Sequence, residues 1–416
     1  MKTLFIYFED KKVGLLQVDE EGVYSFRYEK NWLTSSESFP LSLSLPLSNE
    51  VFGNKLTLSF FENLLPEGDI RLQIEKNRGI HGTYNFLKNF GKDCAGAVTT
   101  LQHEIESADL KIDYTELLVS EIDKAINEKR SVSDLISSID PGYLSIAGAQ
   151  DKFVCVFKDN KFYLPQAMTP TTHIVKIPIQ RSGIRQSVYN EYYCMSLAKS
   201  VGFNVPHFFI FTGSNHPLFV IERYDRIIDS NGAVKRIHQQ DFCQAMGLMS
   251  GSKYEIEGGP SIKDNYQLIQ DNVSIQKRFD NLNSYLDWIS FNLVIGNNDS
   301  HSKNISLLMS RGVELAPFYD MLCTEVYPNL TKRFSFLVGG RNEIDKIGKN
   351  QFEELNQQLG LRKGAFQESL GRILDQVEAS YLLVAEQVKT EFPDCKITTG
   401  IQDLIKIRLR SFRKQI

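Results

Sequence analysis

The amino-acid sequence predicts an α+β fold, in which a β-rich N-terminal module is fused to a strand-rich small lobe and followed by an all-α C-terminal lobe. Three observations support this class. Short runs of alternating apolar residues fill the first part of the chain, strands dominate residues 142–224, and helical periodicity takes over after Gln239. A chain of 416 residues is also too long for one ordinary core, so two or three lobes are expected.

The N-terminal module is predicted over residues 1–105. Residues 4–8 and 23–28 alternate as short strands around a Glu-Glu-Gly turn, and residues 41–45 form a further alternating run. Residues 59–68 then lead into a helix that extends to Arg78. The polar, helix-prone segment 104–138 is the predicted connection to the next lobe.

Strands predominate in the second predicted domain, residues 106–225. Residues 153–164 form a hairpin with Asp159-Asn160 as the turn, and residues 172–178 form another strand. Residues 190–202 read as a helix that ends at a C-cap glycine, Gly202. Residues 207–211 and 218–221 are again strand-like.

The third predicted domain, residues 226–416, is helical. Leu286, Ile289 and Leu293 lie at helical spacing, and residues 350–390 and 401–415 read as amphipathic helices. A strand-rich lobe followed by a helix-rich lobe is the coarse pattern of a bilobal protein kinase.

Composition indicates a globular protein of a reducing compartment. The formal net charge of −4 argues against a chain that grips nucleic acid through its overall field. Six scattered cysteines show no metal-finger spacing and are expected as small core residues, and no signal peptide or membrane span is visible, so the cytoplasm is the default. A basic cluster near the C-terminus (Lys406, Arg408, Arg410, Arg413, Lys414) is interpreted as a solvated helix end.

The run from Asp299 to Asp320 carries the most specific chemistry. Protein kinases place a catalytic base, an amide five residues later and a second acid after two short strands, and Asp299, Asn304 and Asp320 repeat this order. Asp299 could accept the proton of an attacking hydroxyl, while Asn304 and Asp320 offer oxygen ligands to Mg²⁺. His301 is open to several interpretations: proton shuttle, metal ligand, loop brace or ribose-side residue.

Lys176 lies alone within the predicted strand 173–178. It could be an edge lysine that extends to solvent, or a lysine held against the α- and β-phosphates of a nucleotide. The second interpretation requires a carboxylate from the following helix, and Glu191 is placed to supply it.

Two further segments fit a nucleotide site. The small residues Ala147, Gly148 and Ala149 would let backbone N–H groups approach phosphate oxygens, although a plain tight turn would show the same pattern. The strand 218–222 runs into a charged segment, where it either leaves the core or forms an interlobe hinge. In the hinge interpretation, Glu222 and Tyr224 present backbone groups to adenine.

Together these segments resemble the HipA-type serine/threonine kinase toxins. The motifs, in family order, are Phe60-Phe-Glu-Asn-Leu-Leu-Pro-Glu-Gly, Gly91-Lys-Asp-Cys-Ala-Gly-Ala-Val, Ser145-Ile-Ala-Gly-Ala-Gln-Asp-Lys, His173-Ile-Val-Lys-Ile-Pro, Asn190-Glu-Tyr-Tyr-Cys, Ile221-Glu-Arg-Tyr-Asp-Arg, Asp299-Ser-His-Ser-Lys-Asn and Pro317-Phe-Tyr-Asp. Residues 1–105 would then be the family's N-terminal subdomain and residues 106–225 the kinase N-lobe.

The resemblance implies the toxin kinase of a bacterial type II toxin–antitoxin system, which uses ATP and Mg²⁺. Such kinases phosphorylate a serine or threonine of a cytosolic protein, an aminoacyl-tRNA synthetase in the best-known class, and produce a dormant, drug-tolerant state. A HipB-like helix-turn-helix antitoxin is the implied partner and carries the operator DNA contacts. No membrane partner is expected.

The resemblance also assigns roles by matching position. Asp299 would be the base, Lys176 the phosphate lysine, and Ser145 the autophosphorylated serine that switches the kinase off. The implied nucleotide-binding residues are Ala147, Gly148, Ala149, Gln150, Lys152, Lys176, Glu222, Tyr224, His301 and Asp320. The implied metal ligands are Asn304 and Asp320, and the implied supporting residues are Glu191 and Lys303.

Alternatives remain open at this stage. Catalytic parts do not name the acceptor, so a small-molecule or lipid kinase of the same fold is possible, as is a catalytically inactive co-repressor that binds the antitoxin. The departures from the family are few: Tyr224 replaces a frequent phenylalanine, and Asn297-Asn298 before the base supplies no arginine. The N-terminal module is fused, whereas some relatives carry it as a separate protein.

Overall fold

The computed structural model describes residues 1–132, 135–136, 150–166, 168–309 and 312–416. The predicted Ser145, Ala147, Gly148 and Ala149 lie outside these residues. The chain divides into two compact units, each assembled from separated segments. Unit 1 comprises Met1–Ile177, Phe208–Gly251 and Leu307–Arg311, and unit 2 comprises Pro178–His207, Ser252–Ser306 and Gly312–Ile416.

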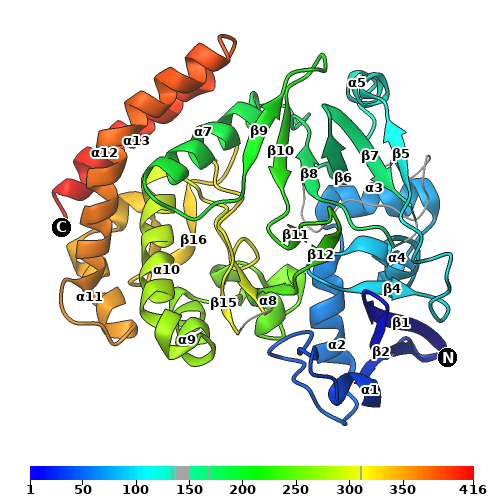
Figure 1. Cartoon of the computed structure of the whole chain (residues 1–416). Helices are drawn as coiled ribbons and strands as arrows, with labels where there is room; N and C mark the ends of the chain where they lie inside the picture. Colours follow the sequence, from blue (N-terminus) through cyan, green and yellow to red (C-terminus); the bar gives the residue numbers. More distant parts are fainter. Residues whose placement is uncertain (133–134, 137–149, 167, 310–311) are drawn as a thin grey trace. The chain divides into compact units, whose positions relative to one another are not determined.

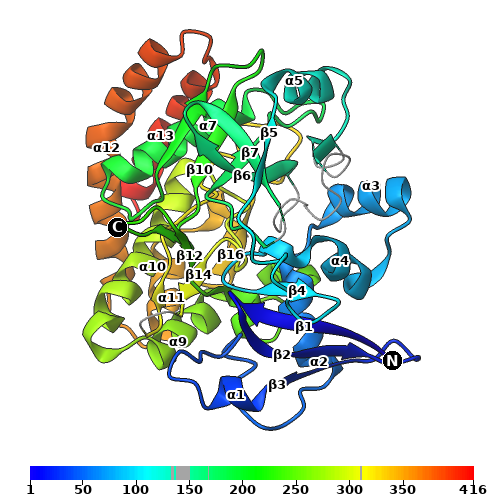
Figure 2. The ribbon, with the colours of Figure 1, turned by 45° about the vertical axis from the view of Figure 1, so that its right-hand side comes forward.

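The N-terminal part of unit 1 is a four-stranded antiparallel sheet in the order β3-β2-β1-β4, which can be followed in Figure 2. Its inward side chains, among them Leu4, Ile6, Leu16 and Phe26, are fully buried because alternate residues of each strand face the same core. The elements are β1 (Lys2–Phe8), β2 (Lys11–Val18), β3 (Tyr24–Tyr28), α1 (Lys30–Leu33), α2 (Asn54–Phe61), η1 (Glu62–Leu64), α3 (Gly68–Arg78), α4 (Gly82–Phe90), η2 (Gly91–Asp93) and β4 (Thr99–Leu101).

The strand predicted at residues 41–45 is wrong. This segment forms only an isolated bridge between Ser42 and Leu45, because its serine hydroxyls bond to side chains and backbone further along the chain. Ser42 Oγ donates to Gln240 Oε1 at 2.7 Å, and Ser44 Oγ donates to the Gln244 carbonyl at 2.8 Å. The alternation of leucine and serine therefore reflects alternating core and hydrogen-bonding contacts of a loop.

A six-stranded sheet in the order β5-β7-β6-β8-β10-β9 forms the strand-rich part of unit 1 (Figure 1). The predicted hairpin turn is confirmed, since Asp159 and Asn160 both adopt positive φ, at 52° and 58°, as a type I′ turn requires. The elements are β5 (Tyr114–Leu117), α5 (Val119–Asn127), β6 (Lys152–Lys158), β7 (Lys161–Pro165), β8 (His173–Lys176), β9 (Phe208–Phe211), β10 (Leu218–Glu222), β11 (Arg226–Ile228), β12 (Val234–Arg236), β13 (Gln239–Asp241) and α8 (Phe242–Ala245).

Unit 2 is built on helices, and α12 packs against α7, α10 and α13 (Figure 1). The lobe predicted as all-α is helix-rich but also contains the antiparallel pair β16-β17, whose turn is Gly339-Gly340. The elements are α7 (Ser187–Ser200), η4 (Glu255–Glu257), α9 (Ile262–Asn272), α10 (Ile275–Ile295), β15 (Glu314–Leu315), β16 (Arg333–Val338), β17 (Arg341–Glu343), η5 (Ile344–Lys346), α11 (Lys349–Gln358), α12 (Ala365–Glu391) and α13 (Ile397–Arg413). Two short elements, η3 (Ser250–Ser252) and β14 (Ser306–Leu308), span unit boundaries.

The basic C-terminal cluster is only partly a solvated helix end. Arg408 is buried, and its guanidinium lies 2.5 Å from Glu325 Oε1 and 3.4 Å from Asp345 Oδ1. Arg413 pairs instead with Asp375 and Glu378 at more exposed positions of α12. The prediction of a purely solvated face is therefore wrong for Arg408, which ties α13 to the body of unit 2.

All six cysteines are buried and unpaired with one another, which confirms their expected role as core residues. Within the described ranges, no helix is both long and apolar enough to cross a bilayer.

Candidate active site

The loop that carries Asp299 begins where α10 ends. Gly296 caps the helix in the left-handed conformation, at φ 71°, where a side chain would be strained and a Cβ would lie 3.0 Å from both Glu325 Cβ and Leu404 Cδ2. The fully buried Asn297 follows, and its Nδ2 donates to Asn292 Oδ1 at 2.8 Å and to the Asp320 carbonyl at 3.4 Å. One amide thus connects the helix end to both acidic segments.

A tight turn brings Asp299 and Asn304 together. The Asn304 side-chain Nδ2 donates to the Asp299 carbonyl at 2.8 Å, and the Asn304 backbone N–H donates to the His301 carbonyl, also at 2.8 Å. Because the amide nitrogen is bound to the loop, the amide oxygen of Asn304 points away from that carbonyl. The Asp299 side chain is 51% exposed, so its carboxylate can meet a group from solution.

Asp320 has a left-handed backbone, with φ 59°, which is uncommon for a residue other than glycine. Such backbone strain persists only where neighbouring contacts enforce it, and it is frequent at functional sites. Part of the predicted hairpin between Asn304 and Asp320 lies outside the described residues; within unit 2, the Ala316 N–H donates to the Ser306 carbonyl at 2.9 Å.

The oxygen donors of Asn304 and Asp320 are the chemistry that Mg²⁺ prefers. Among the described residues, no group of three or more His, Cys, Asp and Glu side chains could hold a metal. One carboxylate and one amide are a donor set that suits Mg²⁺, because this ion keeps most of its ligands as water and phosphate oxygens. His301 lies in the same loop, is 5% exposed, and has Nε2 3.9 Å from Asp299 Oδ1.

Sequence reasoning missed Tyr254. Its hydroxyl is hydrogen-bonded to Asp299 Oδ1, and its ring packs edge-on against His301 with the ring centroids 5.0 Å apart. The next residue, Glu255, accepts a hydrogen bond from the Leu337 N–H at 2.7 Å, and burial raises the pKa of its carboxyl to about 7. No local motif marks Tyr254, because it lies 45 residues before Asp299.

Two lysines lie opposite one another in unit 1. Lys152 of β6 and Lys176 of β8 are direct cross-strand partners, so their side chains extend from the same face of the sheet, and both are at least nine-tenths buried. Like charges at such positions destabilise a sheet unless an anion offsets them. Gln150 connects the neighbouring loop end to β8, since its Nε2 donates to the Ile177 carbonyl at 3.1 Å.

Glu222 and Tyr224 flank the end of β10. Glu222 is the exposed last residue of the strand, and the intervening Arg223 N–H donates to the Thr172 carbonyl at 2.8 Å. The Tyr224 hydroxyl is hydrogen-bonded to Gln239 Oε1.

Directly after this segment, unit 1 contains a cluster of buried charges, which we call the Asp93 cluster: Asp93, Arg223, Asp225, Arg226 and Arg236. The Asp93 Oδ2 accepts from Arg223 Nη1 at 2.9 Å, and Oδ1 accepts from Arg226 Nη2 at 2.8 Å and from Arg236 Nη2 at 3.3 Å. Burial alone would raise the pKa of Asp93, but the guanidinium groups of Arg226, Arg223 and Arg236 outweigh it and hold the pKa below its usual range. The N-terminal module is thereby joined to the segment that follows β10.

Glu191 and Lys303 are buried in unit 2, at 2% and 8% exposure. Lys176 belongs to unit 1, so its predicted partnership with Glu191 stays a prediction. The preceding residue, Asn190, has a clear structural role: it exchanges hydrogen bonds of 2.8 Å with the backbone N–H and carbonyl of Cys323, three residues beyond Asp320.

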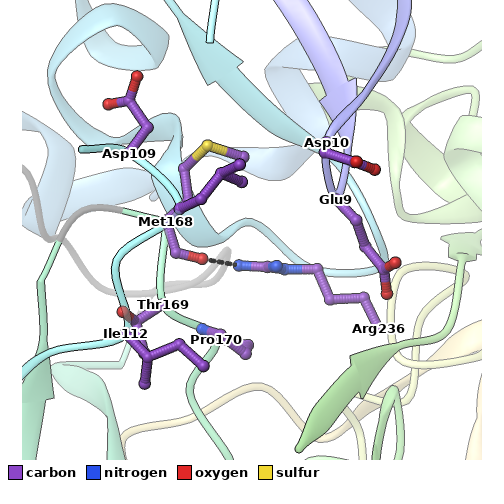
Figure 3. Close-up of a pocket in the computed structure, with 9 residues that line it drawn as sticks. Glu9, Asp10, Asp109, Ile112, Met168, Thr169, Pro170 and Arg236 are labelled. Carbon is purple, nitrogen blue, oxygen red and sulfur yellow. Dashed lines mark hydrogen bonds between the residues drawn. The ribbon is translucent and has the colours of Figure 1, made fainter. Parts of the chain in front are cut away.

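Two cavities, one in each unit, are lined by residues outside the predicted site. One of about 330 Å³ in unit 1 is lined by acidic and apolar side chains and by Arg236, whose guanidinium donates to the Met168 carbonyl at 2.7 Å (Figure 3). Another, of about 590 Å³, lies in unit 2 between α9, α10 and the segment after α11. Neither is lined by a residue of the predicted site.

Comparison with known proteins decides the family. The HipA-like C-terminal domain matches residues 144–399, and the HipA N-terminal domain matches residues 4–101. The chain belongs to the HipA family. The two motifs that begin at Phe60 and Gly91 lie within the N-terminal match, and the motifs from Ser145 to Asp320 lie within the C-terminal match.

Two named proteins align over most of the chain. A Sinorhizobium fredii protein named "Putative kinase Y4mE" is 32% identical over 422 residues, which is 100% of each chain. The serine/threonine-protein kinase toxin HipA of Shewanella oneidensis is 27% identical over 390 residues, or 89% of this chain and 86% of that protein.

The fold is shared with a solved member. A chain in the complex of Shewanella oneidensis HipA, HipB and operator DNA matches with a TM-score of 0.85 at 24% identity, covering 99% of this chain and 98% of that one. The predicted α+β, kinase-like HipA fold is therefore confirmed.

Proposed function

We propose that this HipA-family protein is an ATP- and Mg²⁺-dependent serine/threonine protein kinase and the toxin of a bacterial type II toxin–antitoxin system. The observation that carries the proposal is the Asp299–Asn304 turn, in which a half-exposed carboxylate and a fixed amide lie in one loop. Kinases need this pair, because one group accepts a proton while the other supplies an oxygen to the metal.

In the proposed reaction, the acceptor hydroxyl gives its proton to the Asp299 carboxylate as its oxygen bonds to the γ-phosphorus of ATP. The bond from the γ-phosphorus to the bridging oxygen breaks, and ADP leaves with that electron pair. Lys152 and Lys176 bind phosphate oxygens, and Glu222 and Tyr224 present backbone groups to adenine. Asn304 and Asp320 hold Mg²⁺, which when bound neutralises charge on the phosphate oxygens.

The proposed acceptor is a cytoplasmic protein of translation, an aminoacyl-tRNA synthetase, whose phosphorylation arrests growth. The proposed partner is a HipB-like helix-turn-helix antitoxin that contacts operator DNA. This division of labour is supported by the net charge of −4, which leaves the chain without a strongly basic field of its own. The name of the Shewanella oneidensis relative and the composition of its solved complex support the same assignment.

Ser145 is the proposed site of self-limitation. A phosphoserine carries about two negative charges, and at this position it would compete with the phosphates of ATP for the same loop. Intact mass of the protein expressed alone should show one added phosphate, and Asp299→Ala should show none. An unmodified Ser145 in the active protein would remove this part of the proposal.

The central experiment is phosphoproteomics after brief expression, with Asp299→Ala as the matched control. We expect growth arrest and a small set of new serine or threonine phosphosites with the wild type only, and radiolabel transfer from ATP to the purified target. Radiolabel entering metabolites but not proteins would indicate a small-molecule kinase. Equal growth with both proteins would contradict a toxin.

A further inference from the structure

Tyr254 occupies a position that the proposed function does not yet use. It lies in unit 2 immediately before η4, and its hydroxyl is bonded to Oδ1 of the base, Asp299. The two residues are 45 positions apart, so the contact depends on the tertiary structure and not on a local turn.

The segment around Tyr254 is built to hold the ring in one place. The Tyr254 carbonyl accepts hydrogen bonds from the Glu257 and Gly259 N–H groups, at 3.0 and 2.9 Å. Gly259 admits no side chain, since a Cβ would lie 2.5 Å from the Ser252 carbonyl oxygen. The bond from Leu337 N–H to Glu255 fastens η4 to β16. The loop is therefore a support for the phenol.

The backbone of Asp299 is equally well fixed, but its side chain is not. Asn297 Oδ1 accepts from the Asp299 N–H at 3.2 Å, and the Asp299 carbonyl accepts from the His301 N–H and the Asn304 amide. The half-exposed carboxylate depends on Tyr254 for its orientation. His301 Nε2, at 3.9 Å, is too distant for a hydrogen bond.

The two carboxylate oxygens of Asp299 differ in their hydrogen bonding. Oδ1 is bonded to the Tyr254 hydroxyl, whereas Oδ2 accepts no hydrogen bond from the part of the chain that the structure describes. A carboxylate held by one oxygen presents the other in a defined direction, and positioning of this kind governs rate when a proton must be taken from an incoming hydroxyl.

We propose that Tyr254 is a positioning residue of the kinase, which holds Asp299 by Oδ1 so that Oδ2 receives the acceptor hydroxyl. This inference rests on the proposed function, because it assigns an orientation to the base of that reaction. It assigns no contact between Tyr254 and ATP. Its effect should therefore be on the transfer step and not on nucleotide binding.

The test is Tyr254→Phe, which keeps the ring against His301 and removes only the hydroxyl. Single-turnover transfer from radiolabelled ATP, to the chain itself and to a mixed serine/threonine peptide pool, should slow about tenfold, the scale of one lost hydrogen bond to a charged group. Affinity for Mg-ATP by calorimetry and the thermal midpoint should stay at wild-type values. Tyr266→Phe, in α9 of the same unit, is the matched control and should transfer phosphate at the wild-type rate.

Three results would overturn the inference. An unchanged transfer rate would make the contact incidental, and faster transfer with a lower acceptor KM would mean that the hydroxyl competes with substrate. A fall in Mg-ATP affinity or thermal midpoint in step with the rate would mean a structural role. Failure of the proposed function is distinguishable, because wild-type protein would then transfer no phosphate to either acceptor.

Discussion

The Asp93 cluster of unit 1 and the Asp299 loop of unit 2 each supply hydrogen-bond donors to a carboxylate, but the two carboxylates differ in exposure and in the number of donors. The Asp93 side chain is 0% exposed and uses both oxygens, against three arginines and Thr171. The Asp299 side chain is 51% exposed and uses one oxygen, against Tyr254. A fully satisfied buried charge holds structure together, whereas a partly satisfied and partly solvated charge remains able to react.

The largest effect should follow loss of the buried carboxylate. Asp93→Ala removes the buried carboxylate to which three guanidinium groups donate, and removing one partner of a buried ion pair typically costs about 3–5 kcal/mol. The chain has two tryptophans, Trp32 in unit 1 and Trp288 in unit 2, so urea unfolding in a Trp288→Phe background reports unit 1 alone. Asp10→Asn, at an exposed turn, is the control. A loss under about 1 kcal/mol would show that water reaches the cluster and would erase the contrast with Asp299.

The converse experiment is Asp299→Ala. In the proposed reaction Asp299 is the general base, and loss of such a base lowers a rate by about 10²–10⁴-fold, while a half-exposed side chain with one hydrogen bond contributes little to stability. We expect transfer to fall on this scale with an unchanged unfolding midpoint for Trp288 fluorescence. A large drop in the midpoint would place Asp299 in the same structural class as Asp93.

Low pH should destabilise unit 1 through His238, a buried neutral histidine two positions after Arg236 in the sequence. Burial lowers the pKa of His238 to about 4, outweighing the hydrogen bond to the Leu41 carbonyl. The unfolded chain binds a proton at this residue near pH 6.5 and the folded chain does not, so stability falls as pH decreases from about 6.5 towards 4, by up to on the order of 3 kcal/mol. In His238→Gln this slope should be absent from unit 1 unfolding curves, whereas in His81→Gln, at an exposed site, it should persist. Identical slopes in both variants would refute the assignment.

The smallest effect compares two arginines of α13. Arg408→Ala should cost about 2 kcal/mol, because its buried guanidinium is bonded to Glu325. Arg413→Ala should cost under about 1 kcal/mol, since its pairs with Asp375 and Glu378 are partly solvated. The Trp288 signal in a Trp32→Phe background measures both. Equal losses would mean that burial does not separate structural from incidental ion pairs in this protein.

The sequence could predict what is local. Asp299 and Asn304 lie within one short loop, so their spacing in the sequence was enough to predict that they are close together. The Asp159-Asn160 turn could also be predicted, because the type of a turn depends on adjacent residues. Contacts across long stretches of chain were not. No local pattern around Asp93 predicts its contact with Arg223, 130 positions away, and none around Tyr254 predicts its contact with Asp299.

The serine–leucine run at residues 41–45 shows the opposite failure. Its alternation fits a strand, but hydrogen bonds from Ser42 and Ser44 to residues about 200 positions later fix it as a loop. Periodicity records which side chains are buried and leaves open what buries them.

Unit 2 is assembled from separated segments of the chain, which affects the order in which it can fold during synthesis. The turn that precedes Asp299 packs against α13, because Gly296 lies within van der Waals reach of Leu404, and Arg408 of the same helix bonds to Glu325. During synthesis from the N-terminus, the Asp299 loop therefore gains this support only after α13 has been made and has packed.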